Sequence, residues 1–189
     1  MLKIYHLKLK IKPLASRAKD VGLKLMALLG LTAFLILLTG TLWASEIFRG
    51  QVERVNDGDT LTLLTNDYER VKVRLYGIDA PELAQSGGEA SKAALERLVR
   101  GLTVEVESID VDRYSRQVGL VRLKDRLINL ELIEEGQAWV YERYCKLASL
   151  CRSFRQAQKR ARESSVGLWR ESDPKPPWEF RQNHRRGGR

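Results

Sequence analysis

The sequence predicts an α+β fold, in which a five-stranded Greek-key β-barrel packs against about three α-helices. Five short runs of alternating apolar and polar residues predict the strands. One amphipathic stretch after the third run and two helical stretches after the fifth predict the helices. Short strands that are interrupted and followed by helices favour a small barrel of the OB type.

The expected strands are separated by residues that favour turns. The first three runs cover residues 48–55, 60–64 and 70–78, and the turn-forming sequences NDG and ND lie between them. The fourth and fifth runs cover residues 102–109 and 117–123, and the polar segment DVDRYSR joins them. The chain order is therefore three strands, a helix and two more strands.

Glycines mark the ends of the expected helices. Residues 89–101 place alanine, leucine and valine on one stripe and end in a glycine. A second apolar repeat at helical spacing begins at Ile128 and stops at Gly136. A third helix is expected from about residue 150 to 164, basic on its exposed side and followed by Gly167.

The net positive charge of the sequence comes from its two ends. The 189 residues include 33 Lys and Arg against 24 Asp and Glu, and 43% are hydrophobic, which excludes disorder throughout. Residues 1–44 hold seven basic residues and one acid, and residues 181–189 hold four arginines and no acid. The remaining 22 basic and 23 acidic residues nearly balance. Binding of nucleic-acid phosphates would therefore depend on individual arginines and not on the overall charge.

An uncharged stretch precedes the expected domain. Residues 25–43 contain 19 residues without a charge, and the basic segment 1–24 comes before them. Such a stretch can span about 30 Å of hydrocarbon, and its basic flank predicts an N-terminus in the cytoplasm. Residues 25–44 are expected to form either a transmembrane anchor or a signal peptide cleaved after Ala44, and both interpretations stay open.

Both interpretations export the rest of the chain to a periplasm or the cell exterior. The protein is then anchored with its N-terminus inside and its C-terminus outside, or it is secreted. The domain is expected to cover residues 45–172 and to be a monomer. Residues 173–189 are rich in Pro, Arg and Gly, and we expect them to form a flexible tail.

The chain has two cysteines, Cys145 and Cys151. In an exported protein a closely spaced pair favours a disulfide over two thiols. Two unpaired thiols remain the alternative, because the sequence gives no distance between the two Cα atoms.

Three polar clusters hold the residue types that suit chemistry. DGDT spans residues 57–60, and a hairpin turn explains its first part but not Asp59 and Thr60. The other two clusters are RLYGIDAPE at residues 74–82 and DRYSR at residues 112–116.

The combination of acids and arginines in these clusters predicts a phosphodiesterase. Carboxylates without His or Cys form a hard-oxygen site that suits Ca²⁺ or Mg²⁺. Two arginines can hold a phosphodiester through bidentate contacts and stabilise the charge that develops on its oxygens. A further carboxylate can orient an attacking water or take its proton.

In this order and at this separation, the three clusters resemble those of the staphylococcal nuclease (thermonuclease) family. The resemblance covers about residues 48–169 and includes DGDT, RLYGIDAPE, DRYSR, NLELIEEGQAWVY and the closing GLW. Family membership implies the OB-fold barrel that the strand pattern favours.

The resemblance also implies a metal site and a general base. Asp59 and Asp79 would be Ca²⁺ ligands, with the backbone carbonyl of Ala80 as a third. Ala80 stands where many relatives have Thr, and a carbonyl ligand needs no hydroxyl. Glu82 would be the general base or would position the attacking water, and Asp57 would lie near the ion.

Other matched positions would contact the nucleic acid. Arg74 and Arg116 would bind the scissile phosphate, and Arg116 would assist the leaving oxygen. Arg113, Tyr114 and Tyr144 resemble nucleotide-contacting positions. Arg113 stands where Lys is familiar in the family, and a serine replaces the glycine that commonly precedes the catalytic arginine.

The activity implied by the resemblance is Ca²⁺-dependent hydrolysis of single-stranded or frayed DNA and RNA that leaves 3′-phosphate ends. Little base specificity is expected, because phosphate contacts position a nucleic acid without reading its sequence. The alternative is a catalytically inactive OB-fold module that binds nucleic acid and is anchored to a membrane. Such modules typically lose one or more of the acids or arginines of the site. This chain retains all five of these side chains, namely Asp59, Asp79, Glu82, Arg74 and Arg116.

Overall fold

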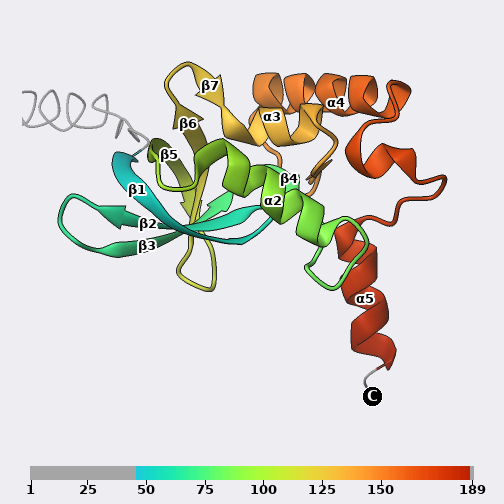
Figure 1. Cartoon of the computed structure of the whole chain (residues 1–189), viewed down its shortest axis with the longest axis horizontal. Helices are drawn as coiled ribbons and strands as arrows, with labels where there is room; N and C mark the ends of the chain where they lie inside the picture. The colour runs from blue at the N-terminus through green and yellow to red at the C-terminus, as the bar shows by residue number, and fades with distance from the viewer. Residues whose placement is uncertain (1–45, 188–189) are drawn as a thin grey trace, which may run out of the picture. The chain divides into compact units, whose positions relative to one another are not determined.

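The computed structural model describes residues 46–187, which form a closed β-barrel with helices packed beside it (Figure 1). The five barrel strands are β1 Glu46–Asp57, β2 Thr60–Thr65, β3 Arg70–Leu75, β5 Thr103–Val111 and β6 Gln117–Leu123. Antiparallel pairs join β1 to β2, β2 to β3, β1 to β5 and β5 to β6. A parallel pair between β3 and β6 closes the barrel, which confirms the predicted five-stranded OB-type fold.

Three helices confirm the expected helical segments. They are α2 Gly88–Val99, α3 Ile128–Glu134 and α4 Ala148–Glu163, and the short 3₁₀ helix η1 Gly167–Arg170 follows them. Of three two-residue strands, β7 Arg126–Leu127 pairs with β6, whereas β4 Ile78–Asp79 and β8 Trp139–Val140 form a separate small sheet. β4 pairs with β8, so the end of RLYGIDAPE is fixed beside the segment that follows α3.

The apolar faces of the strands and helices meet in one core. Its fully buried members come from the barrel strands and from α2, α3 and α4, and they include Leu61, Leu63, Val73, Leu75, Leu95, Ile128, Leu132 and Phe154. A second, smaller cluster contains Trp139, Ala161, Leu168 and Trp169. Trp139 and Trp169 are buried and are therefore core aromatics.

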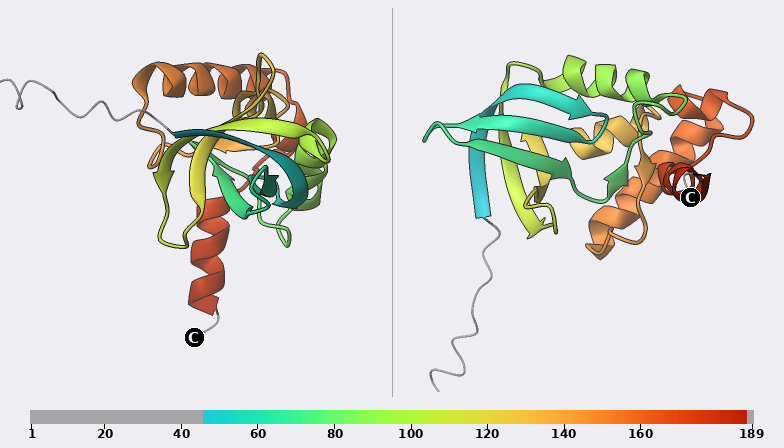
Figure 2. Two further views of the ribbon diagram at one scale, coloured as in Figure 1. Left: turned by 90° about the vertical axis from the view of Figure 1, so that its left-hand side faces the viewer. Right: turned by 90° about the horizontal axis from the view of Figure 1, so that it is seen from below.

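The prediction of a flexible tail is wrong for residues 177–187, because these residues form a further helix, α5 Pro177–Gly187. The proline pair suggested an extended chain, but a proline at the first helical position has the φ angle a helix needs and leaves no amide unpaired. The amides of Glu179 and Phe180 donate to the carbonyl of Pro176. α5 begins close to the body of the domain and projects away from it (Figures 1 and 2).

Cys145 and Cys151 form a disulfide with a Cα–Cα distance of 5.7 Å. It joins the segment after β8 to the first turns of α4. The hydroxyl of Tyr76 also fixes this segment, because it accepts hydrogen bonds from the amides of Lys146 and Leu147 at 2.6 and 3.0 Å.

The apolar stretch at residues 25–44 lies outside the described residues. Within residues 46–187, no helix has the length and apolarity needed to cross a membrane.

Asn129 is a fully buried polar residue at the start of α3. Its Oδ1 accepts a hydrogen bond from the amide of Val121 at 2.9 Å, and its Nδ2 donates to the carbonyls of Tyr76 and Gly119 at 3.0 and 3.3 Å. One side chain therefore connects α3, β6 and the turn after β3.

Replacing Asn129 by Ala should lower the free energy of unfolding by about 3 kcal/mol, because a buried amide and carbonyl each lose their partner. Urea denaturation followed by circular dichroism measures the change. Ser153→Ala on the exposed face of α4 is the control, with an expected change below about 0.5 kcal/mol. Equal midpoints for the two variants would contradict the connecting role of Asn129.

Candidate active site

Two aspartates from different strands are buried together at one end of the barrel. Asp59 precedes β2 and is 2% exposed, and Asp79 ends β4 and is 0% exposed. The Asp59 carboxylate accepts hydrogen bonds from the amide of Ala80 at 2.7 Å and from the hydroxyl of Thr60 at 3.1 Å. The DGDT cluster and the RLYGIDAPE cluster are thus joined directly.

Local packing explains the glycine in DGDT. Gly58 and Asp59 form the turn between β1 and β2, because Asp57 pairs with Thr60. A Cβ atom on Gly58 would lie 2.6 Å from Cβ of Ser91 on α2 and 2.7 Å from Cβ of Ala80. Only glycine lets the turn approach α2 this closely, so DGDT is both a hairpin turn and part of the acidic cluster.

Arg74 on β3 bridges the two buried aspartates. Its Nη1 lies 2.8 Å from Oδ1 of Asp59, and its Nη2 lies 2.6 Å from Oδ1 of Asp79. The pairing of Thr60 with Arg74 between β2 and β3 places the guanidinium there. Such charge-assisted contacts offset part of the cost of burying two carboxylates.

Burial and mutual repulsion shift the acids in this cluster. Desolvation, followed by the charge of Asp59, raises the pKa of Asp57 to about 6. Desolvation also raises the pKa of Asp79, against the opposing effect of hydrogen bonds from arginine. Burial disfavours the charged form of Arg74, but the charges of Asp59 and Asp79 outweigh it and raise its pKa. The cluster therefore favours additional positive charge.

A second arginine, Arg181 from α5, supplies that charge. Its Nη2 lies 2.7 Å from Oδ2 of Asp79, and its Nη1 lies 2.7 Å from Oε1 of Glu82. Burial disfavours its charged form, but the hydrogen bonds to Asp79 and Glu82 outweigh it and raise the pKa of Arg181. Arg181 thereby bridges the carboxylates of Asp79 and Glu82.

The donor atoms of this cluster fit a hard cation. The carboxylates of Asp59, Asp79 and Glu82 provide only oxygen ligands, the kind that Ca²⁺ prefers. In this structure the guanidinium groups of Arg74 and Arg181 take the cationic role. Among residues 46–187, no group of three or more His, Cys, Asp and Glu side chains is arranged to hold a metal ion.

The closure of the barrel brings the third cluster to the same end. The parallel pairing of β3 with β6 sets Val73 beside Gln117 and Arg74 beside Val118, so Arg116 lies directly before the paired stretch, two positions before the level of Arg74. Asp112 holds Arg116, because its Oδ2 lies 2.7 Å from Nε and 2.6 Å from Nη2. Burial works against the ionised acid, but the hydrogen bonds from Arg116 outweigh it and lower the pKa of Asp112.

Exposed side chains surround Arg116. Arg113 lies over the ring of Tyr114 at 4.8 Å, and Arg116 lies at 5.5 Å from the same ring. Ser115 has a φ of 58°, in the left-handed region that glycine adopts without steric cost. The serine in place of the familiar glycine therefore keeps the turn at the cost of some backbone strain.

Tyr144 reaches this end of the domain through the pairing of β8 with β4. Asp79 pairs with Trp139, and the amide of Tyr141 donates to the carbonyl of Gly77 at 2.8 Å. The Tyr144 ring is exposed and lies 4.8 Å from the ring of Tyr141. The expected nucleotide-contacting residues are thus exposed on two loops, one before β6 and one after β8.

The sequence analysis missed two charged residues of the site. Asp112 lies inside the motif DRYSR, and its spacing to Arg116 at i+4 was the available signal. Arg181 lies 102 residues after Asp79, in a segment expected to be flexible, and no local pattern connects the two.

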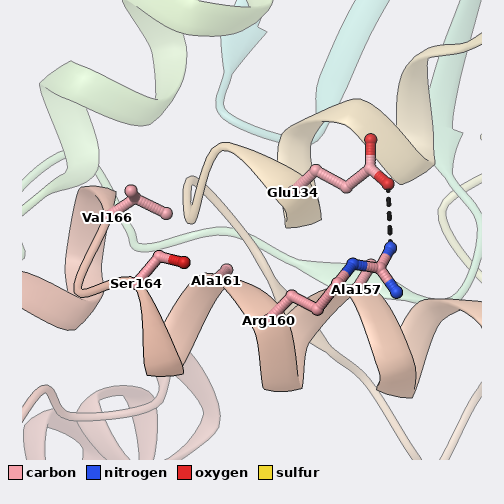
Figure 3. Close-up of a pocket in the computed structure, with 6 residues that line it drawn as sticks. All are labelled: Glu134, Ala157, Arg160, Ala161, Ser164 and Val166. Carbon is pink, nitrogen blue, oxygen red and sulfur yellow. Dashed lines mark hydrogen bonds and ion pairs between the residues drawn. The ribbon is translucent and has the colours of Figure 1, made fainter.

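A shallow pocket between α3 and α4 is separate from this cluster (Figure 3). Its lining residues are Glu134, Ala157, Arg160, Ala161, Ser164 and Val166. Glu134 and Arg160 form an ion pair of 3.1 Å across it. None of the acids or arginines described above lines this pocket.

A closed OB-type barrel with buried carboxylates and arginines at one end offers the groups that phosphodiester cleavage requires. The chain belongs to the staphylococcal nuclease family, because the family described as "Staphylococcal nuclease homologue" matches residues 72–171. It is therefore a nuclease.

Similar proteins carry names that agree with this family. An "Uncharacterized endonuclease" of Haemophilus influenzae is 38% identical over 135 residues, which cover 71% of this chain and 74% of the relative. A "Micrococcal nuclease" of Shigella flexneri is 34% identical over 168 residues, covering 84% and 94%. A "Probable staphylococcal-like nuclease CAN1" of Oryza sativa is 36% identical over 119 residues, covering 63% and 35%.

Replacing Asp112 by Asn should lower the rate of nucleic-acid cleavage. The amide loses the charge that holds the Arg116 guanidinium, and misplacing a catalytic group by about 1 Å can cost about a hundredfold in rate. We expect kcat to fall about tenfold to a hundredfold, measured on single-stranded DNA. Asp125→Asn, in the exposed turn between β6 and β7, is the control, and equal kcat values for the two variants would exclude the positioning role of Asp112.

Proposed function

We propose that the domain is a Ca²⁺-dependent endonuclease that hydrolyses single-stranded or frayed DNA and RNA with little sequence specificity and leaves 3′-phosphate ends. The observation that supports it is the joining of three distant motifs at one end of the barrel. Arg74 bridges the buried carboxylates there, β6 after Arg116 pairs with β3, and β8 before Tyr144 pairs with β4.

The buried acids supply the binding site for the ion. Asp59 and Asp79, with the carbonyl of Ala80, would hold Ca²⁺, which supplies charge neutralisation and polarisation of the phosphate. The amide of Ala80 already fixes the orientation of Asp59, so these ligands are held by the backbone. A rigid site keeps the ligands in place before the ion binds.

The remaining charged groups act on the phosphodiester. Arg74 and Arg116 would hold the scissile phosphate and stabilise the negative charge on its oxygens as the bond to the 5′-oxygen breaks. Glu82 would orient the attacking water or take its proton, since it lies at the edge of the cluster and is half-exposed. The leaving 5′-oxygen would receive help from Arg116.

The exposed loops suit a single strand of nucleic acid. Tyr114 and Tyr144 offer ring faces on which unpaired bases can stack without regard to sequence. Arg113 adds a contact to the phosphate backbone. Duplex DNA keeps its bases stacked inside, so single-stranded or frayed substrates are favoured.

We also propose that the domain works outside the cytoplasm, carried there by residues 25–44 as an anchor or a signal. The Cys145–Cys151 disulfide supports an oxidising compartment. This location agrees with a substrate such as free nucleic acid in the periplasm or medium.

The central test is cleavage of single-stranded DNA and RNA by the full-length chain, with Ca²⁺, with Mg²⁺ and with a chelator. Arg116→Ala should lower the Ca²⁺-dependent rate by about a hundredfold or more, as removal of a transition-state donor typically does. Arg152→Ala on the exposed side of α4 is a charge-matched control that should cleave like the wild type. A folded chain that binds DNA without cleaving it under any condition would instead indicate an inactive binding module.

Calcium should also stabilise the fold. A ligand that binds only the folded state at 100 times its Kd adds about 2.7 kcal/mol to the free energy of unfolding. The melting temperature should therefore rise during a Ca²⁺ titration, and Asp79→Asn should remove most of the rise. A wild-type midpoint that stays flat up to millimolar Ca²⁺ would refute calcium binding.

A further inference from the structure

Arg181 contacts the two carboxylates that the proposed function needs most. Its guanidinium contacts both carboxylate oxygens of Asp79, at 3.2 and 2.7 Å, and one oxygen of Glu82 at 2.7 Å. Asp79 is the more buried of the proposed metal ligands, and Glu82 is the proposed water-positioning group. Arg181 thus contacts both a proposed metal ligand and the proposed water-positioning carboxylate.

Aromatic packing holds α5 in this position. Trp178 stacks on Tyr141 with ring centroids 5.4 Å apart and an interplanar angle of 5°. It also meets the edge of Trp139 at 5.7 Å. The chain before α5 is tied to the loop that follows Glu82, because Gln85 donates to the carbonyl of Lys175 at 2.6 Å. Helix α5 is therefore docked at the site by several independent contacts.

The remainder of α5 has little contact with the body of the domain. The helix projects outward, and its side chains at residues 182–184 are exposed (Figures 1 and 2). Arg181 itself is 28% exposed, so its ion pairs are reached by solvent and salt and are weaker than fully buried pairs. Docking of this kind can open without unfolding the barrel.

The Arg181 guanidinium and a Ca²⁺ ion would compete for the same carboxylates. Arg181 donates to Oδ2 of Asp79 and to Oε1 of Glu82, both at 2.7 Å, whereas a calcium ion would need its oxygen ligands at about 2.3–2.6 Å. Two cations held against the same carboxylates would also repel each other. The binding of Ca²⁺ and the docking of Arg181 therefore exclude one another.

We propose that α5 is an autoinhibitory latch, in which Arg181 takes the position of the metal ion and must withdraw before Ca²⁺ binds. This inference rests on the proposed Ca²⁺-dependent nuclease function. The latch keeps the buried acids neutralised without metal, and it keeps Trp178 on Tyr141, next to the proposed nucleotide contact Tyr144. Rising Ca²⁺ shifts the chain from the docked form to the open, active form.

The latch lowers the apparent affinity for Ca²⁺ by the fraction of molecules that are open. If about a tenth of the molecules are open without metal, removing the latch should lower the apparent Kd about tenfold. A purely structural role of Arg181 predicts the opposite, because loss of a supporting ion pair would loosen the metal ligands.

The experiment is isothermal titration of Ca²⁺ into three full-length chains: the wild type, Arg181→Gln and the charge-matched control Arg152→Gln. We expect an apparent Kd about tenfold lower for Arg181→Gln and unchanged for Arg152→Gln. Melting curves should cross: without Ca²⁺ the Arg181→Gln chain melts below the wild type, and its Ca²⁺-induced rise is larger. An equal or weaker affinity in Arg181→Gln overturns the latch.

A second variant frees the helix without altering the acids. Trp178→Ala removes the aromatic contact that docks α5, and it should also lower the apparent Kd. Hydrogen exchange of amides in residues 177–187 should accelerate when Ca²⁺ is added to the wild type. Unchanged exchange at saturating Ca²⁺ overturns the latch, even if Ca²⁺ binds.

Cleavage of single-stranded DNA, measured in parallel, separates this inference from the proposed function. Ca²⁺-dependent cleavage with identical Ca²⁺ affinity in the wild type and Arg181→Gln supports the nuclease and rejects the latch. No Ca²⁺ binding and no Ca²⁺-dependent cleavage in any chain rejects both.

Discussion

The burial of two carboxylates at the end of a closed barrel is the constraint on which this structure depends. Asp59 and Asp79 lie almost wholly inside the protein, where an unpaired charge costs several kcal/mol. The register of β2 against β3 places Arg74 between Asp59 and Asp79, where its positive charge offsets part of this cost. Burial still raises the pKa of Asp79, although two arginines contact its carboxylate. The second of these cations, Arg181, also pairs with Glu82.

The elements around that pocket could be predicted because their signals are local. Alternating apolar residues identify the five strands. Gly136 follows the end of α3, and Gly167 follows the end of α4. The residue types of DGDT and RLYGIDAPE predict a hard-oxygen cluster, and the structure joins the two motifs through the hydrogen bond from the amide of Ala80 to Asp59. The pairing of β3 with β6 that closes the barrel could be expected only from the OB fold as a whole, because no residue pattern in either strand specifies its parallel partner.

Helix α5 could not be predicted, because its stability comes from contacts made far along the chain. The segment is polar and contains two adjacent prolines, which is typical of an extended chain. Its order depends on Trp178 against Tyr141 and on Arg181 against Asp79, and neither partner is visible from residues 173–189 alone. The left-handed conformation of Ser115 is a similar case, since the barrel imposes a backbone angle that serine disfavours.

The two arginines of the acidic pocket differ in whether they can leave it. Arg74 sits within β3, and moving it would break the strand pairing that closes the barrel. Arg181 lies on α5, which would undock with the loss of the contacts of Trp178 with Tyr141 and Trp139 and of the ion pairs of Arg181 with Asp79 and Glu82. In the proposed latch, only Arg181 can therefore exchange with Ca²⁺ while the fold persists. Activation in this proposal is the replacement of one cation by another at the same carboxylates.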